Sequence, residues 1–288
     1  MNTAEALAEL GVGHDDLSEE NRRRLDEDGY FLVPDVFSSD QVEQLRHEFD
    51  RWEAREAIAM PGYNIEPGGV FLIDLFNKSD VFDLCFLCKP TLEAAQELLG
   101  EIRISSLNGR NPAKNAGQQV LHSDGYRFGP TDWRIVNTMI LLDDMSAENG
   151  ATRLVPGSHK WPPLNVPYDF VLQESDSVMA ERAAMPELSD DEKALIPEDP
   201  VAPHPQEVLV TGRAGTICVI NAHIWHGGTK NSSGEKRRLL HFAVGRRDRA
   251  PELVQRDYLT PSLRSRTSPA EKYLLDIEGA DAVAPDVE

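Results

Sequence analysis

The spacing of apolar residues changes once along the chain, near residue 101, and this change limits the folds that the chain can adopt. Before it, apolar positions at helical spacing predict helices over 18–28, 38–58 and 80–100. After it, short apolar runs are separated by Gly, Asn and Pro, which is typical of strands joined by turns. Helices first and strands later predict an α+β fold with a mainly β core, a sandwich or a barrel, rather than repeated βαβ units.

Local patterns refine this prediction. Ser38 and Gln41 can form a capping box at the start of the second helix, whose apolar stripe is expected to be core. Gly212 and Gly215 in "TGRAGT" predict a hairpin, because glycine adopts positive φ where a chain reverses. Segment 60–71 is expected to be a loop. The predicted strands lie in 30–37, 101–112, 118–124, 133–145, 150–159, 205–228 and 237–247.

One long segment interrupts the strands. Residues 160–206 are rich in proline and acidic residues, and so long a loop in a compact domain is usually functional or mobile. We predict a lid-like insertion that contains a short helix capped by Ser189 and Glu192; the alternative is a disordered surface excursion. Residues 1–275 are predicted to be a single domain, and 276–288 an unstructured tail.

Composition narrows the possible partners and location. Acidic residues (49) outnumber basic ones (29), and the net charge of −20 disfavours nucleic acid and anionic lipid. No apolar run is long enough for a membrane helix, and residues 1–30 lack the order of a secretory leader, so we predict a cytoplasmic protein. Cys85, Cys88 and Cys218 lie in apolar surroundings, which favours core packing over zinc or redox chemistry.

A histidine and an aspartate stand two residues apart in "QQVLHSDGY", at the end of a predicted strand. Alternation along a strand directs His122 and Asp124 to the same face. Two imidazoles and one carboxylate on one face of a metal leave positions open, which is the arrangement of non-haem iron(II) oxygenases. The third ligand must come from later in the chain, where His223 and His226 follow the apolar run "TICVIN". We predict His226, because two glycines follow it and let the backbone pass close to a bound group; His223 is the alternative.

The order of three segments resembles that of the phytanoyl-CoA dioxygenase family of iron(II)- and 2-oxoglutarate-dependent oxygenases. The segments are "LHSD", "NGATRLVPGSH" and "GTICVINAHIWHGGTKNSSGEKR". The amino-terminal "LDEDGYFLVPDVFSSDQVEQLR" resembles the entry helix and strand of that family, and the likeness covers residues 22–245. It implies a double-stranded β-helix (jelly roll) in which His122, Asp124 and His226 bind iron. It also implies that Arg237 binds the distal carboxylate of 2-oxoglutarate, with Arg238 as the adjacent alternative. A guanidinium suits this role because it offers a carboxylate a bidentate fork.

The resemblance extends to two weaker positions and contains one departure. Gln119 matches a position at which relatives hydrogen-bond the co-substrate, and Thr152 is expected to line the same pocket. Relatives often carry a hydroxyl residue two positions after the distal histidine, where this chain has Gly228. The distal carboxylate therefore either has one donor fewer or takes it from Thr229.

The implied function is that of a hydroxylase-type oxygenase that uses iron(II), 2-oxoglutarate and O2 to oxidise an unactivated C–H bond. The carboxylate of Asp124 disfavours halogenation; demethylation, desaturation and ring closure remain alternatives to hydroxylation. A small metabolite or natural-product intermediate is the expected substrate, since no basic cluster suited to an acyl-CoA stands out in so acidic a chain. Tyr126, Arg127 and Trp133, which follow the His-x-Asp motif, are predicted to line its pocket.

Two other classes of protein explain part of the pattern. A zinc-dependent hydrolase or isomerase can also use two histidines and an aspartate, but it leaves Arg237 unexplained. A jelly-roll module that binds a small molecule without catalysis would keep the histidines as remnants. A monomer or a homodimer is expected in each case.

Overall fold

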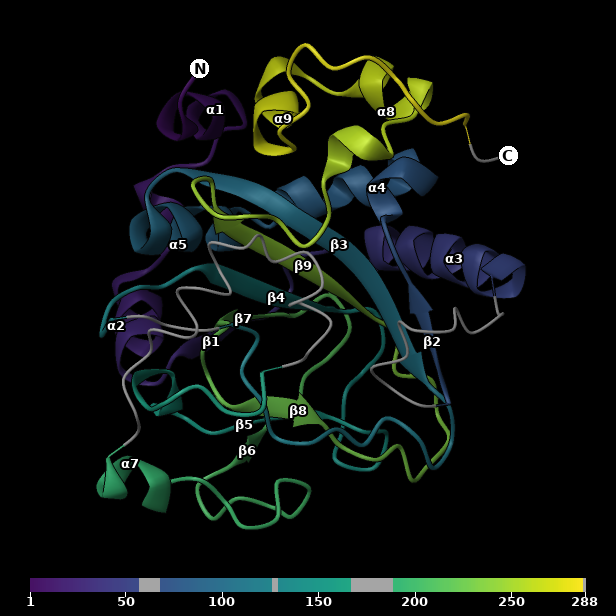
Figure 1. The fold of residues 1–288 in the computed structure, drawn as a ribbon. Helices are drawn as coiled ribbons and strands as arrows, with labels where there is room; N and C mark the ends of the chain where they lie inside the picture. Colours follow the sequence, from purple (N-terminus) through teal and green to yellow (C-terminus); the bar gives the residue numbers. More distant parts are fainter. Residues whose placement is uncertain (57–67, 126–128, 167–188, 287–288) are drawn as a thin grey trace.

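Two antiparallel β-sheets form the centre of the protein (Figure 1). The computed structural model describes residues 1–56, 68–125, 129–166 and 189–286. The larger sheet has six strands in the order β1 (Tyr30–Val33), β7 (Ile217–Asn221), β4 (Ile135–Leu141), β9 (Leu239–Arg246), β3 (Ile102–Pro112) and β2 (Gly69–Leu72). The smaller sheet has three, in the order β6 (Val208–Leu209), β5 (Thr152–Leu154) and β8 (His226–Gly228). The prediction of an α+β fold with a mainly β core is therefore confirmed.

Most of the helices pack on the side of the large sheet that faces away from the small one, whereas α7 (Asp190–Ala194) lies on the side of the small sheet (Figure 1). The predicted capping box opens α3: Ser38 N–H donates to Gln41 Oε1 at 2.9 Å, and Gln41 N–H donates to Ser38 Oγ at 3.3 Å. The α-helices are α1 (Thr3–Glu9), α2 (Glu19–Glu27), α3 (Ser39–Glu56), α4 (Leu75–Lys78), α5 (Lys89–Leu99), α7 (Asp190–Ala194), α8 (Pro261–Arg266) and α9 (Pro269–Leu274). Short 3-10 helices are η1 (His14–Asp16), η2 (Asp80–Leu87), η3 (Ser158–Lys160) and η5 (Gln255–Asp257).

Side chains alternate across the large sheet and so divide its two faces. On β9, Leu240, Phe242 and Val244 join the apolar cluster under the helices, which also contains Phe49 and Trp52 of α3. A second cluster connects the two sheets and includes Met139, Cys218, Ile220, Leu154 and Val210. The same inner face also has polar residues on β3 and β9, among them Ser106, Asn108 and His241.

The predicted hairpin around "TGRAGT" is wrong. β6 pairs with β5 in the small sheet, whereas β7 pairs with β1 and β4 in the large one, so the chain crosses between sheets here. Gly215 does take positive φ (+89°), and a Cβ there would lie 2.6 Å from the carbonyl oxygen of Phe37. The glycines predict a change of direction, but they do not tell whether the flanking strands belong to one sheet.

The other segment predictions have mixed outcomes. All three cysteines are buried and free, as expected, and burial raises the pKa of each thiol. The capping box of Ser189 and Glu192 opens α7, but the central part of the predicted lid, 167–188, lies outside the described residues, as does most of the predicted loop 60–71. The single domain and the lid stay predictions.

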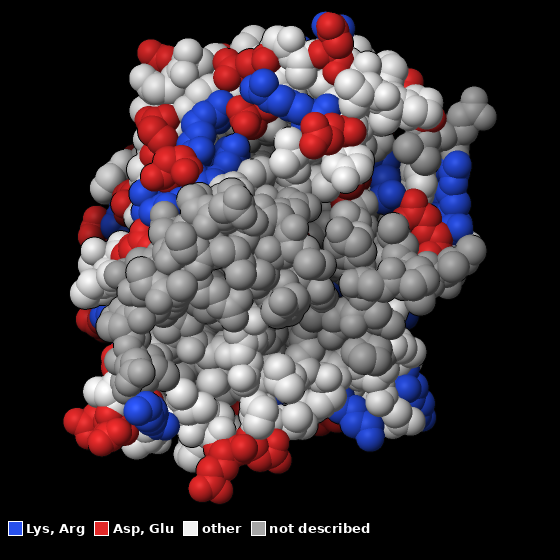
Figure 2. All heavy atoms as spheres, in the orientation of Figure 1, with Lys and Arg blue, Asp and Glu red and all other residues white. Residues whose placement is uncertain are grey.

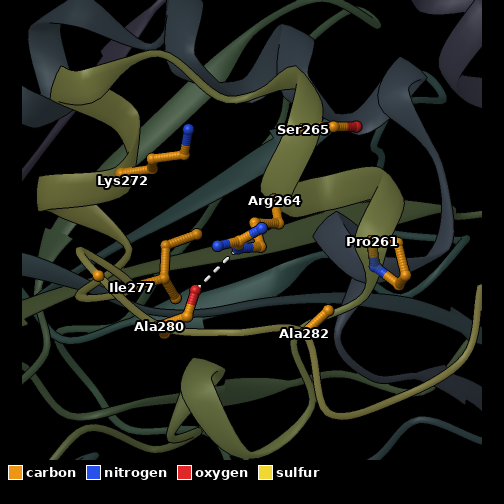
Figure 3. Close-up of a pocket in the computed structure, with 8 residues that line it drawn as sticks. Pro261, Arg264, Ser265, Lys272, Ile277, Ala280 and Ala282 are labelled. Atoms are coloured by element: carbon orange, nitrogen blue, oxygen red, sulfur yellow. Dashed lines mark hydrogen bonds between the residues drawn. The ribbon is translucent and has the colours of Figure 1, made fainter.

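The carboxyl-terminal segment differs from a free tail. It contains no helix or strand between residues 276 and 286, yet Ile277 is 2% exposed, and the N–H groups of Val283 and Ala284 donate to the carbonyl of Leu259. A pocket of about 540 Å³ lies between this segment and the helices α8 and α9, and Arg264 lines it while donating to the carbonyl of Ala280 (Figure 3). The pocket is on the helical side of the large sheet, and none of its lining residues belongs to the metal site.

Charged side chains of both signs are mixed on the described part of the surface seen in Figure 2. Arg246, for example, pairs with both Asp248 and Asp132. Among the described helices, none is long and apolar enough to cross a lipid bilayer.

Candidate metal centre

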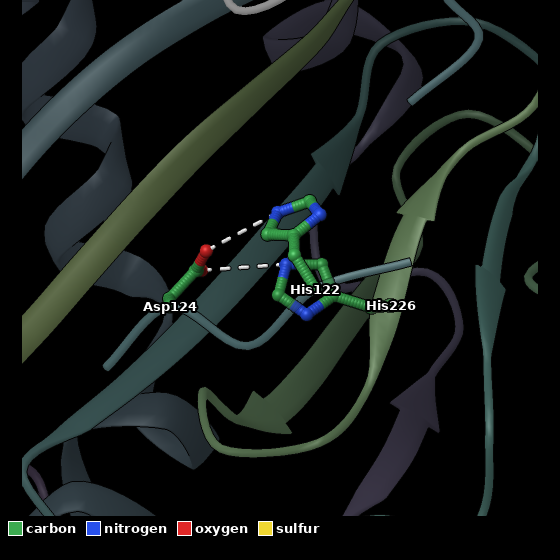
Figure 4. A group of neighbouring side chains, drawn as sticks. All are labelled: His122, Asp124 and His226. Atoms are coloured by element: carbon green, nitrogen blue, oxygen red, sulfur yellow. Dashed lines mark ion pairs between the residues drawn. The ribbon is translucent and has the colours of Figure 1, made fainter. Parts of the chain in front are cut away.

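Two histidines and an aspartate from distant parts of the chain meet between the sheets (Figure 4). His122 and His226 face each other through a pair of backbone hydrogen bonds, from His122 N–H to His226 O at 2.9 Å and from His226 N–H to His122 O at 2.8 Å. Asp124 N–H donates to the carbonyl of Ala222. These backbone bonds fix all three residues on one framework.

The segment 118–124 is not the strand that its sequence predicts. Only His122 forms a bridge; the N–H of Leu121 donates to the carbonyl of Pro200, and that of Ser123 to the carbonyl of Leu164. These partners lie on either side of residues 167–188, so tertiary contacts replace a regular ladder. His122 and Asp124 nevertheless point into one site, as expected from their spacing of two.

The side-chain geometry suits a divalent cation. His122 Nε2 lies 3.4 Å from Asp124 Oδ1, and His226 Nε2 lies 3.4 Å from Asp124 Oδ2. One potential ligand atom from each residue lies within 4.8 Å of the other two, and the three residues are between 6% and 7% exposed. Two imidazole nitrogens and a carboxylate are the donor set of open iron(II) sites.

Backbone carbonyls orient both imidazole rings in the same way. His122 Nδ1 lies 2.9 Å from the carbonyl oxygen of Val120, and His226 Nδ1 lies 2.9 Å from that of Ile224, in each case two residues earlier. A carbonyl can only accept, so each Nδ1 carries the proton and each Nε2 is left with a lone pair. Both lone pairs are therefore available to a metal beside Asp124. The residues present thus fit the predicted iron(II) ion.

Asp124 is held in its charged form. Burial alone raises the pKa of its carboxyl group, but His226 and His122 outweigh burial and bring that pKa well below its usual range. Asn137 on β4 also donates through Nδ2 to Asp124 Oδ2 at 2.5 Å. Asn137 is a site residue that the sequence alone does not single out; its only signal is a polar side chain inside the apolar run "IVNTMIL".

His223 is not part of this group of three. It is 4% exposed, its N–H donates to Asn221 Oδ1, and its ring centroid lies 5.5 Å from that of Trp133. Trp133 also contacts His159, at 5.6 Å between ring centroids. Tyr126 and Arg127 lie outside the described residues, so the predicted pocket role of these three side chains stays a prediction.

The two neighbouring arginines before β9 differ in their contacts. The guanidinium of Arg238 donates to Asp143 at 2.8 and 2.9 Å and to Asp50 at 2.8 Å, so its positive charge is already paired with these two carboxylates. Arg237 is 1% exposed, and its N–H donates to Asn111 Oδ1 at 3.3 Å. The contacts of Arg238 favour Arg237 as the arginine that binds the co-substrate, and that role stays a prediction.

The remaining predicted residues surround β8. Gln119 Oε1 accepts a hydrogen bond of 2.6 Å from Gly228 N–H, and Thr152, which is 5% exposed, pairs with Gly228 across the small sheet. Thr229 Oγ1 donates its proton to the carbonyl of Ala151 at 2.7 Å. The hydroxyl proton of Thr229 is thus already bound to a backbone carbonyl, and this structure does not offer it to the distal carboxylate of 2-oxoglutarate.

Close packing explains why glycine stands at position 228. A Cβ there would lie 2.6 Å from the carbonyl oxygen of Gly117 and 3.2 Å from Gln119 Oε1. Contacts this short do not occur without movement of the backbone. The hydroxyl side chain that relatives often carry at this position therefore does not fit here.

Introducing that hydroxyl at position 228 is expected to destabilise the fold. Gly228→Ser should lower the free energy of unfolding by about 1–3 kcal/mol, because the new side chain meets backbone rather than open space. Thermal unfolding measures the loss, and the KM for 2-oxoglutarate should not fall. Gly13→Ser is the control, since a Cβ at Gly13 meets nothing within 4 Å. A serine variant as stable as the parent, with a lower KM, would contradict this explanation.

Comparisons with known proteins agree with the site. The family model for phytanoyl-CoA dioxygenase (PhyH) matches residues 25–239. Dioxygenase af480 of Aspergillus fumigatus is 26% identical over 242 residues, and the match covers 78% of this chain but 65% of the fungal protein. The ectoine dioxygenase of Stutzerimonas stutzeri is 25% identical over 245 residues, covering 79% of this chain and 76% of the relative.

Solved structures show the same fold. HygX from Streptomyces hygroscopicus, with nickel, 2-oxoglutarate and hygromycin B bound, aligns with a TM-score of 0.58 and 23% identity, covering 82% of this chain and 90% of HygX. Apo EctD from S. alaskensis aligns with a TM-score of 0.56 and 21% identity, covering 80% of this chain and 78% of EctD.

Proposed function

The chain belongs to the phytanoyl-CoA dioxygenase family, and we propose that this iron(II)- and 2-oxoglutarate-dependent oxygenase hydroxylates, or otherwise oxidises by hydrogen abstraction, a C–H bond of a small metabolite or natural-product intermediate. The observation that carries the proposal is the convergence of His122, Asp124 and His226, whose potential ligand atoms lie within 4.8 Å of one another. With both Nδ1 atoms bound to carbonyls, this set can offer a metal ion two Nε2 lone pairs and one negative charge.

The residues of the site have distinct tasks in this proposal. His122 and His226 would hold iron(II) through Nε2, and Asp124 through its carboxylate. Iron(II) with 2-oxoglutarate and O2 supplies the oxidising power for cleaving an unactivated C–H bond. Asn137 keeps the Asp124 carboxylate in place through the bond to Oδ2, and the carbonyls of the two residues Val120 and Ile224 keep the rings from turning.

Arg237 would bind the distal carboxylate of 2-oxoglutarate. It is 1% exposed, and a guanidinium in such a place offsets the cost of burying the negative charge of the co-substrate. A zinc hydrolase or isomerase has no use for a buried cation of this kind, which favours the oxygenase over that alternative. Segment 160–206 would exclude water from the site as a lid.

The comparisons support a polar small-molecule substrate. Ectoine dioxygenases are among the similar proteins, and the HygX structure holds hygromycin B. The net charge of −20 is poorly suited to the phosphates of an acyl-CoA. We therefore propose that the substrate is a small polar metabolite. We also propose that the enzyme acts in the cytoplasm.

A spectroscopic titration tests this function before any substrate is known. Anaerobic iron(II) followed by 2-oxoglutarate should produce the weak visible charge-transfer band of the iron chelate, and admission of O2 should then release succinate slowly. His226→Ala should show no band, whereas His223→Ala, a neighbouring buried histidine, should keep it. A parent protein that binds zinc but shows neither band nor succinate would instead indicate the hydrolase or the binding module.

A further inference from the structure

A second group of polar side chains lines the inner face of the large sheet beside the metal centre. The strand register arranges them, together with the apolar residues Ala243 and Met139, in two rows across β3, β9 and β4. Ser106, Ala243 and Asn137 form one row, and Asn108, His241 and Met139 form the next. Since Asn137 also binds Asp124, the first row runs directly to the metal ligand.

Glu252 closes the far end of these rows. Its carboxylate accepts hydrogen bonds from Ser106 Oγ and from Asn108 Nδ2, the latter at 3.3 Å, and its own N–H donates to Ser105 Oγ at 2.7 Å. Burial raises the pKa of Glu252, the hydrogen bond from Ser106 and the charge of Arg110 lower it, and the charge of Asp124 raises it again. Ser106 and Asn137 both pair with Ala243 and so lie on one face of the sheet, which places the Glu252 carboxylate on the same face as Asp124.

A small residue separates the two ends. Ala243 is 2% exposed but belongs to neither of the apolar clusters that flank the large sheet. Neighbouring strands lie about 4.8 Å apart, so the Ser106 and Asn137 backbones are about 10 Å apart across Ala243. That span suits a small molecule that lies over Ala243, with one end at Glu252 and the other at the metal centre.

Two buried polar atoms near Ala243 have no hydrogen-bond partner among the described residues. Asn137 is 1% exposed, and its Oδ1 has no hydrogen-bond partner among the residues that the structure describes. The same holds for the buried Nδ1 of His241, and burial together with Arg110 lowers the pKa of His241 to about 4, so the ring is neutral at pH 7. Buried polar atoms without partners are costly, and a ligand that donates a hydrogen bond to Asn137 Oδ1 would relieve part of this cost.

We propose that Glu252 is a specificity-determining residue of the substrate site and that the substrate is an amine or polyhydroxyl compound whose donor group binds its carboxylate. Asn137 Oδ1 accepts a further hydrogen bond from the same molecule, and His241 Nδ1 forms another with it, which places an adjacent C–H bond at the metal centre. This inference rests on the proposed oxygenase function and adds the chemical class of its substrate.

The test compares the iron-loaded full chain with its Glu252 variants. Succinate release is measured first without substrate and then with a panel of amines, aminocyclitols, aminosugars and cyclitols, alongside carboxylates and acyl thioesters. Compounds that donate hydrogen bonds should stimulate release, and Glu252→Ala should raise their KM about 10- to 100-fold. Glu43→Ala, a change at an exposed carboxylate of α3, should not alter the KM.

Glu252→Gln separates the two kinds of donor. It keeps the shape of the side chain and loses its charge, so the KM should rise strongly for a protonated amine and little for a hydroxyl compound. The unfolding temperature of metal-free Glu252→Ala should fall, because Ser106 and Asn108 lose the acceptor of their hydrogen bonds. A purely structural residue would lower the unfolding temperature in the same way but leave the KM of every compound unchanged.

Three results would overturn the inference: stimulation confined to carboxylates or thioesters, no stimulation by any donor-bearing compound, or an unchanged KM in Glu252→Ala. A parent protein that forms no succinate with iron and 2-oxoglutarate would overturn the proposed function itself, and this inference with it.

Discussion

Asp124→Gly should lose iron-dependent succinate formation altogether, and its affinity for iron(II) should fall by more than about 100-fold. Removing only an outer partner of a metal ligand typically costs 10- to 100-fold, and this change removes a ligand and the only negative charge of the set. Iron binding measured by anaerobic titration and succinate measured under O2 give the two values.

The control for this change is Asp15→Gly, because Asp15 is fully exposed and remote from the site. That variant should bind iron and release succinate as the parent does. If Asp124→Gly kept succinate formation at the parental rate with its fold intact, Asp124 would not be a metal ligand.

Arg237→Ala should raise the KM for 2-oxoglutarate about 100-fold while leaving iron affinity nearly unchanged. A charge-assisted bidentate contact contributes about 2–4 kcal/mol when its two hydrogen bonds are counted together, and the alanine leaves the distal carboxylate buried without a cation. Steady-state kinetics give the KM, and the intensity of the chelate band during titration gives the dissociation constant.

Arg238→Ala separates this effect from general damage. Arg238 binds Asp143 and Asp50, so its loss should lower the unfolding temperature through the carboxylates that it leaves unpaired. Its KM for 2-oxoglutarate should stay near that of the parent. The opposite result, a high KM in Arg238→Ala and a normal one in Arg237→Ala, would assign the co-substrate to Arg238.

Local signals predicted much of the fold. The cap at Ser38 and Gln41 depends on neighbours three residues apart, so the sequence contains all that is needed to place it. The strand predicted at 118–124 and the hairpin at Gly212 failed because both depend on partners far along the chain. In segment 118–124, two backbone N–H groups donate to the carbonyls of Pro200 and Leu164. At Gly212, the chain crosses from one sheet to the other.

The site shows the same division. The spacing of His122 and Asp124 and the glycines after His226 were enough to predict which residues meet. Asn137 and Glu252 were missed, because a polar residue in an apolar strand and an acidic residue after a strand have no local pattern that announces a site. Only long-range contacts place them: Asn137 binds Asp124 directly, and Glu252 reaches the same face of the sheet through Ser106 and Asn108.

In the proposed complex, one iron ion lies between His122, Asp124 and His226, with 2-oxoglutarate reaching from it to Arg237. Crystals grown anaerobically with iron(II) and 2-oxoglutarate, measured on both sides of the iron absorption edge, test it directly. The predicted result is a single iron anomalous peak among both Nε2 atoms and the Asp124 carboxylate, with the co-substrate carboxylate on Arg237. A peak at His223, a peak elsewhere, or a co-substrate bound away from Arg237 would contradict it.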